Sequence, residues 1–266
     1  MTQIFVHAGF HKTGTSSLQD YLRTHRAALS DHVQIHLKED FLEAGNLARR
    51  YGQKPYPHRR LRFARALRKY LSGVQDHPRH LLSWEGFSGI MPGHRRLTGP
   101  VRNIHRAAIP LNRTIIRALR RRFGSDVDIT FYYSLRDSDQ WIRSVHGHLL
   151  RSIRLTEDET TFINGFSPPI QLDREAARIA KAIAPVRLET SWLRDTKNRR
   201  EGPAAALLDL IDLPKDIRDT LPRAALTNAG NTAEMRAKCL EWNINIKDDH
   251  ELKRMKDELT GFHRRS

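Results

Sequence analysis

Short apolar runs alternate with segments of helical periodicity through the first two thirds of the chain. The runs of strand length are residues 3–8, 33–37, 80–84, 127–135 and 186–188. The run at 127–135, VDITFYYSL, is rich in β-branched and aromatic residues and is the clearest strand. Strands that alternate with helices predict an α/β fold of three layers, with a central parallel sheet and a ligand site at the carboxyl ends of its strands.

The helices are expected at residues 14–29, 59–71, 111–123, from about 138 to 153, and 172–183. Asp137 or Ser138 can cap the fourth of these, and Pro168-Pro169 interrupts the pattern before the last. In the helix at 59–71 we expect a buried apolar stripe made of Leu61, Ala64, Leu67 and Leu71. From about residue 190 the chain is mostly helical, and a single domain over residues 1–266 accounts for the whole pattern.

Composition limits the class of protein. A chain of 266 residues with 39% hydrophobic residues is large enough to bury the core of one α/β domain. No run approaches the ~18 apolar residues of a membrane span, and the start MTQIFVHAGF lacks the pattern of a leader peptide. We therefore expect a cytoplasmic protein, with peripheral attachment to the inner membrane face left open. The single cysteine, Cys239, excludes an internal disulfide and a cysteine-based metal site.

The formal net charge of +16 is concentrated in two segments. Residues 49–70 contain nine Lys and Arg, residues 94–122 contain nine more, and neither segment contains an acid. They are either solvated helix faces or a positive field that attracts an anionic nucleotide, an acidic glycan, a lipid head group or an anionic membrane. Nucleic acid is disfavoured, because the segments lack stacking aromatics and finger spacing.

The loop after the first predicted strand has the composition of a phosphate site. It reads HAGFHKTGTSSLQ over residues 7–19. Gly14 permits a sharp turn, successive backbone N–H groups can face one anion, and Lys12 adds a full positive charge to the helix start. An ordinary capped turn needs one hydroxyl and no lysine. The predicted phosphate-binding residues are Lys12, Thr13, Gly14, Thr15, Ser16 and Ser17.

The loop differs from a Walker A motif, because Thr15 follows the second glycine and the lysine stands two positions before it. This disfavours an ATP-dependent P-loop kinase, which is kept as an alternative. The order Lys12-Thr13-Gly14-Thr15-Ser16 resembles instead the 5′-phosphosulfate loop of the sulfotransferase family. Its bacterial and glycan-modifying members are more similar than the cytosolic aryl enzymes, whose K-x-x-H base motif and C-terminal motifs we do not find.

A second motif supports the same resemblance. Arg136 directly follows the strand at 127–135, and Ser144 lies eight residues later in the next helix. Members of the family bind the 3′-phosphate of their nucleotide with such an Arg and Ser. A guanidinium fork and a hydroxyl suit a doubly charged terminal phosphate.

The resemblance implies the P-loop NTPase-like sulfotransferase fold, with 3′-phosphoadenosine-5′-phosphosulfate as the donor and adenosine 3′,5′-bisphosphate as the product. The sulfuryl group would pass to a hydroxyl or amine of an acceptor, without a metal. Glycan-modifying members place a glutamate just past a middle strand, and Glu85 in LLSWEGF has that position. Glu85 is therefore the expected base, and Lys12 would neutralise charge on the leaving oxygen.

Several alternatives stay open. His7 and His11 flank the loop and are rival bases, although His7 is expected to pack within its strand. A non-catalytic polyanion-binding protein of the same fold is the second alternative function. His146 and His148 point apart on a helix and predict no metal site. Core packing is favoured for Trp84 and Trp141. Residues 227–232 are expected to form a loop and to cap the helix that follows. The acceptor and the oligomeric state are not predicted.

Overall fold

The computed structural model describes residues 1–96, 99–225, 232–259 and 261, and it divides into two compact units. The first contains Met1–Asp137 and Gln171–Leu226, and the second contains Ser138–Ile170 and Thr227–Ser266. The expectation of one domain over residues 1–266 stays a prediction. Within the described residues, the search for a helix both long and apolar enough to span a membrane finds none.

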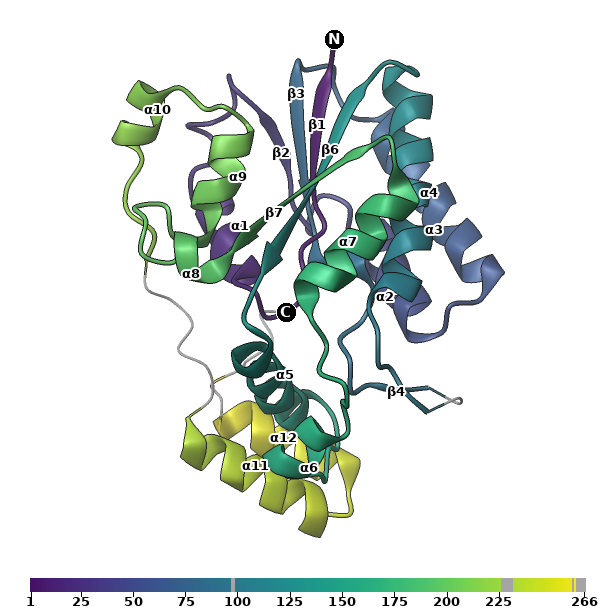
Figure 1. The fold of residues 1–266 in the computed structure, drawn as a ribbon, viewed down its shortest axis with the longest axis vertical. Helices are drawn as coiled ribbons and strands as arrows, with labels where there is room; N and C mark the ends of the chain where they lie inside the picture. Colours follow the sequence, from purple (N-terminus) through teal and green to yellow (C-terminus); the bar gives the residue numbers. More distant parts are fainter. Residues whose placement is uncertain (97–98, 226–231, 260, 262–266) are drawn as a thin grey trace. The chain divides into compact units, whose positions relative to one another are not determined.

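The first unit is built on a sheet of five parallel strands (Figure 1). Their order is β2-β3-β1-β6-β7, and their bounds are Gln34–His36, Arg79–Ser83, Gln3–His7, Asp128–Leu135 and Arg187–Trp192. Every predicted strand is present and every pairing is parallel, which confirms the predicted central parallel sheet. The last strand continues to Trp192, beyond its expected end, because its residues 190–192 pair with the end of β6.

The register brings the ends of the strands to one edge of the sheet. His7, the last residue of β1, lies opposite Ser83 of β3 and Tyr132 of β6. β6 continues to Leu135, which pairs with Trp192. The loops that follow β1, β3, β6 and β7 therefore all leave from the same edge, where a parallel α/β sheet binds its ligands.

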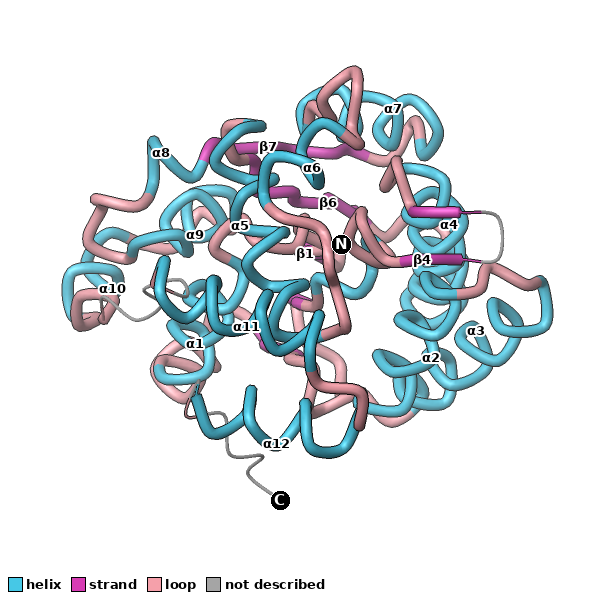
Figure 2. Tube along the Cα trace, turned by 90° about the horizontal axis from the view of Figure 1, so that it is seen from below, coloured by secondary structure: helices cyan, strands magenta, loops and turns pink. Residues whose placement is uncertain are grey.

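Helices cover both faces of this sheet and make three layers (Figures 1 and 2). On one face lie α1 (Thr15–Thr24), α8 (Leu193–Thr196), α9 (Ala205–Leu210) and α10 (Lys215–Thr220), and on the other α2 (Leu42–Gln53), α3 (Pro57–Ser72), α4 (His105–Phe123) and α7 (Leu172–Ile183). Phe5, Leu81 and Tyr132 of the strands form one core with Leu18 and Leu22 of α1. Short elements complete the unit: the 3-10 turns η1 (Glu85–Ser88) and η2 (Gly202–Ala204), and the hairpin of β4 (Arg95–Arg96) and β5 (Gly99–Pro100).

Two sequence expectations for this unit are wrong in detail. The first helix ends at Thr24, and the chain continues through turns to Leu29, which is buried although Ala27 and Ala28 before it are exposed. In α3 the buried residues are Phe63, Ala66, Leu67 and Leu71, while Leu61 is 66% exposed. The large ring of Phe63 sets which side of the helix faces the core, and Leu61 lies on the other side.

The second unit is helical and joins two distant segments of the chain. It contains α5 (Ser138–Ser152), α6 (Glu159–Asn164), α11 (Ala233–Asn245) and α12 (Asp249–Leu259). The buried amide of Asn243 donates to the carbonyls of Leu150 (3.0 Å) and Leu155 (2.8 Å), which ties α11 to the end of α5. Thr232 caps α11 by accepting a hydrogen bond from Met235 N–H, and residues 227–231 of the predicted loop lie outside the described residues.

Candidate functional site at the carboxyl edge of the sheet

The loop between β1 and α1 turns sharply. Gly9, Lys12 and Gly14 have positive φ values of 49°, 69° and 89°. A lysine seldom adopts such a conformation, and residues that do so cluster at binding sites. The N-cap of α1 is Gly14, which has no side chain to cap the helix, and the first intrahelical bond runs from Leu18 N–H to Gly14 C=O. The start of α1 is therefore not the ordinary Ser/Thr-capped turn that the sequence left as an alternative.

Thr13 anchors this loop to the sheet. Its side chain is fully buried, and its hydroxyl donates to the carbonyl of Phe10 at 2.6 Å. Because that bond uses its one proton, the hydroxyl of Ser134 in β6 donates to Thr13 Oγ1, also at 2.6 Å. Thr13 can therefore offer a ligand its backbone N–H but not its hydroxyl. Of the other predicted loop residues, Thr15 is buried, Ser17 is half-buried and Ser16 is exposed.

Arg136 contacts the same loop from the end of β6. Its Nη1 donates to the carbonyl of Lys12 at 3.2 Å. The side chain is half-buried, and its Nε lies away from solvent with no hydrogen-bond partner. Burial lowers the pKa of the guanidinium, while Asp137, itself paired with Arg194, raises it. A buried N–H donor without an acceptor beside a positively charged loop is a favourable environment for an anion.

The structure thus brings Lys12 and Arg136, two of the predicted anion-binding residues, into direct contact. Ser144 lies in α5 and belongs to the second unit, so its predicted partnership with Arg136 stays a prediction.

Glu85 begins η1, directly after β3, at the same edge of the sheet. Its half-buried carboxylate accepts a hydrogen bond of 2.8 Å from Nε2 of Gln19 in α1. Its carbonyl accepts a second one from the hydroxyl of Ser88. The partner of the carboxylate is thus a neutral amide and not one of the many arginines of the chain. Sequence reasoning missed Gln19, although it lies one helical turn after Thr15 and so on the same side of α1.

The two rival histidines have different environments. His7 is fully buried, its Nδ1 bonds the hydroxyl of Ser83 at 2.7 Å, and burial lowers its pKa to about 3. It is thus a packed, neutral strand residue, as expected. His11 is half-buried, and its Nε2–H donates to the carbonyl of Gly89 at 3.2 Å. Burial lowers the pKa of His11, and the charge of Glu85 opposes that shift.

Basic residues from the charged segments contribute to this edge. Burial, together with the nearby charges of His11 and Arg49, lowers the pKa of His94 to about 4. Arg49 also lowers the pKa of His11. Arg49 therefore brings part of the positive charge expected around residues 80–90 close to His11, a relation that the linear sequence does not show, whereas His94 is neutral near pH 7.

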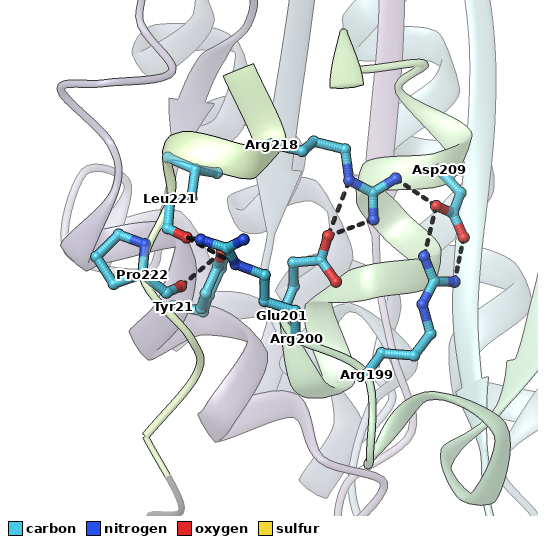
Figure 3. A network of polar contacts seen from close by, with 8 residues as sticks. All are labelled: Tyr21, Arg199, Arg200, Glu201, Asp209, Arg218, Leu221 and Pro222. Carbon is cyan, nitrogen blue, oxygen red and sulfur yellow. Dashed lines mark hydrogen bonds and ion pairs between the residues drawn. The ribbon is translucent and has the colours of Figure 1, made fainter. Parts of the chain in front are cut away.

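The segment after β7 packs behind the loop. A Cβ atom on Gly14 would lie 2.9 Å from Leu193 Cδ1 and 3.1 Å from Pro203 Cβ, so only glycine fits between them without displacement. A network of charged residues holds this segment in place (Figure 3). Arg218 donates to Glu201 and Asp209, Arg199 donates to both oxygens of Asp209, and Arg200 donates to the carbonyls of Asp219 and Leu221.

The remaining candidates pack in the core of the unit to which each belongs. Trp84, directly before Glu85, is buried, with Nζ of Lys38 4.7 Å from its ring centre, and Trp141 of the second unit is buried as well. In the second unit the buried His146 donates from Nε2 to the carbonyl of Glu157 at 3.0 Å. Across the described part of the chain, no group of three or more His, Cys, Asp and Glu residues is arranged to hold a metal ion.

A scan of the chain against models of protein families gives no match, and a search of curated proteins finds no similar chain.

Proposed function

We propose that this protein is a sulfotransferase that moves a sulfuryl group from 3′-phosphoadenosine-5′-phosphosulfate to a hydroxyl or amine of an acceptor. The observation that carries the proposal is the contact between Arg136 Nη1 and the carbonyl of Lys12. A nucleotide with phosphates at both its 5′ and 3′ positions needs two cationic anchors within reach of one molecule. The phosphate loop and the end of β6 supply a cation each at one edge of the sheet.

The residues of the loop fit the 5′ side of such a nucleotide. The first-turn amides of α1, at residues 15–17, carry the partial positive charge of the helix N-terminus. The hydroxyl of the exposed Ser16 and the ammonium of Lys12 can supplement them. Arg136, whose Nε has no acceptor of its own, would bind the 3′-phosphate, and Ser144 is the proposed second donor.

The chemistry is assigned to two residues. Glu85 accepts the proton of the acceptor hydroxyl or amine, whose oxygen or nitrogen then forms a bond to sulfur. The bond between that sulfur and the oxygen of the 5′-phosphate breaks, and Lys12 stabilises the charge left on this oxygen. Gln19 positions the Glu85 carboxylate through its 2.8 Å hydrogen bond.

A ligand comparison by thermal shift tests the assignment. Adenosine 3′,5′-bisphosphate without metal should raise the melting temperature of the protein, because a ligand that binds only the folded state stabilises it. ATP with Mg²⁺ should raise it less. The opposite order would overturn the proposal in favour of a P-loop phosphotransferase.

Three variants separate the two anchors from a general charge effect. Lys12→Ala and Arg136→Ala should each weaken bisphosphate binding by about tenfold or more, since each removes a charge-assisted contact. Arg187→Ala is the matched control, because Arg187 is an exposed arginine that pairs with Asp128 at the opposite edge of the sheet. Equal losses in all three variants would contradict a specific site.

Turnover distinguishes an enzyme from a non-catalytic binder. Glu85→Gln should abolish sulfation while bisphosphate affinity stays within about twofold, because only proton removal is lost. Undiminished turnover by this variant would exclude Glu85 as the base and leave His11 as the alternative.

A further inference from the structure

Most of the positive charge of α3 and α4 lies on their outer surfaces. Eight exposed cations, here called the basic face, are Arg62, Arg65, Arg68 and Lys69 of α3 with Arg106, Arg117, Arg120 and Arg121 of α4. Arg113 of α4 is also exposed, but it donates to the carbonyl of Ala182. At ~100° per residue each set falls on one side of its own helix. The opposite sides are buried, through Phe63 and Leu67 in α3 and through Leu111 and Ile115 in α4.

The two helices run side by side in the same layer (Figures 1 and 2). Near their C-terminal ends, Arg122 of α4 donates from Nε to the carbonyl of Leu71 at 3.1 Å and from Nη2 to that of Val74 at 2.7 Å. Phe63, in the middle of α3, packs on Phe87 of η1, and Ala107, in the first turn of α4, closely approaches Gly89. The two helices are therefore neighbours, and each has its own row of exposed cations.

These charges have no acidic partner among the residues that the structure describes. In the described ranges, none of the basic-face side chains forms an ion pair or a hydrogen bond with a carboxylate. Arginines elsewhere in the same unit do so regularly, as Arg23 does with Glu39 and Arg218 with Glu201. Such a set of cations attracts an extended anionic partner, since no carboxylate in the described part of the chain competes for them.

Exposed apolar groups accompany the cations. Leu61 is 66% exposed on the same side of α3 as Arg65 and Arg68, and Tyr56, just before the helix, is 44% exposed. The ring of Tyr56 stacks on His58, and the guanidinium of Arg59 lies 5.8 Å from its centre. The ring already has stacking partners, so it is poorly placed to stack on nucleic-acid bases.

We propose that the basic face docks on an anionic phospholipid surface. Guanidinium groups bind lipid phosphates, while a leucine and a tyrosine can enter the apolar–polar boundary of a bilayer. Nucleic acid or an acidic glycan would match the charge but would leave Leu61 without a partner. The proposal does not depend on the sulfotransferase assignment, because the basic face is separate from the loop at residues 9–14 and from Glu85.

Vesicle co-sedimentation tests this proposal with the full chain. The protein should bind mixed phosphatidylserine–phosphatidylcholine vesicles, bind pure phosphatidylcholine vesicles far less, and lose binding as NaCl is added. The charge-reversal variant R62E/R65E/R68E should bind the mixed vesicles more weakly by on the order of a hundredfold. The matched variant K197E/K215E/K253E makes the same charge change at exposed lysines outside the basic face and should lose no more than about threefold.

Leu61→Ser separates a lipid surface from other polyanions. It should weaken vesicle binding by about tenfold through the lost apolar contact, while any binding to duplex DNA or heparin stays unchanged. Because Leu61 is exposed, the melting temperature should not move. The proposal is overturned if both triple variants lose vesicle binding equally, or if Leu61→Ser has no effect and DNA binds more tightly than the vesicles do.

Discussion

The side-chain amide of Gln19 in α1 donates a hydrogen bond of 2.8 Å to Oε2 of Glu85 at the start of η1. This bond links the helix that follows the loop at residues 9–14 to the turn that follows the neighbouring strand β3. The proposed base is therefore oriented by the same helix whose N-terminus would bind the nucleotide.

Gln19→Ala tests that link. Removing the amide frees the Glu85 carboxylate to rotate, so kcat should fall by about tenfold while bisphosphate affinity stays unchanged. The measurement is sulfation kinetics beside a binding titration. Gln3→Ala, at the opposite end of β1 where Gln3 accepts a bond from Arg79, is the control and should leave kcat unchanged. A Gln19→Ala variant with full kcat would show that Gln19 does not position Glu85.

Replacing Gly14 tests whether the shape of the loop is needed for binding. Its φ is 89°, and Leu193 and Pro203 lie close to the position of a Cβ atom. Gly14→Ala should lower the free energy of unfolding by about 2 kcal/mol and abolish bisphosphate binding, since a left-handed alanine is strained and its Cβ displaces Leu193 or the loop. Gly124 also has a positive φ, 97°, but no atom lies within 4 Å of its Cβ position. Gly124→Ala should lose similar stability and retain binding. Loss of binding in both variants would indicate a general effect of instability.

The network of Arg218, Glu201 and Asp209 is expected to stabilise the segment after β7, which packs behind the loop (Figure 3). Arg218→Met leaves the buried carboxylate of Glu201 without its cation and should cost about 3 kcal/mol in urea unfolding. Arg23→Met removes a more exposed arginine that pairs with Glu39 and should cost less than ~1 kcal/mol. Similar costs for the two variants would contradict a structural role for the network.

Buried histidines predict sensitivity to acid. Burial lowers the pKa values of His36 and His80 from 6.5 to about 4, and the two rings touch at 3.2 Å between Nε2 and Nδ1. Between pH 4 and pH 6.5 these two histidines bind more protons in the unfolded chain than in the folded one. The free energy of unfolding should therefore fall as the pH is lowered from about 6.5 to about 4, by up to ~1.4 kcal/mol per pH unit for each histidine.

Urea titrations at several pH values measure this slope. His36→Gln should flatten it, whereas the exposed His58→Gln should leave it as in the unmodified chain. A free energy of unfolding that stays constant across this pH range would contradict the prediction.

The periodicity of the sequence predicted the elements that carry the fold. All five strands of the sheet and the helix at Leu172–Ile183 lie where their patterns indicated, because buried strands and amphipathic helices leave a local signature. The helix α2 was missed, although Phe41, Ala44, Ala48 and Tyr51 are all buried at helical spacing. The buried side of α3 was predicted wrongly through Leu61. Apolar residues lie on more than one side of this helix, and the packing of Phe63 decides which side is buried.

The candidate site was likewise predictable only in part from the sequence. The composition of residues 9–17 and the position of Arg136 after a strand marked candidate anion-binding groups, since each depends on neighbours in the chain. Tertiary structure alone decided that Arg136 meets the carbonyl of Lys12, that Gln19 holds Glu85, and that the hydroxyl of Thr13 is used within the protein. Strand order and register determine these contacts between residues distant in sequence, and no local pattern encodes which strand ends become neighbours.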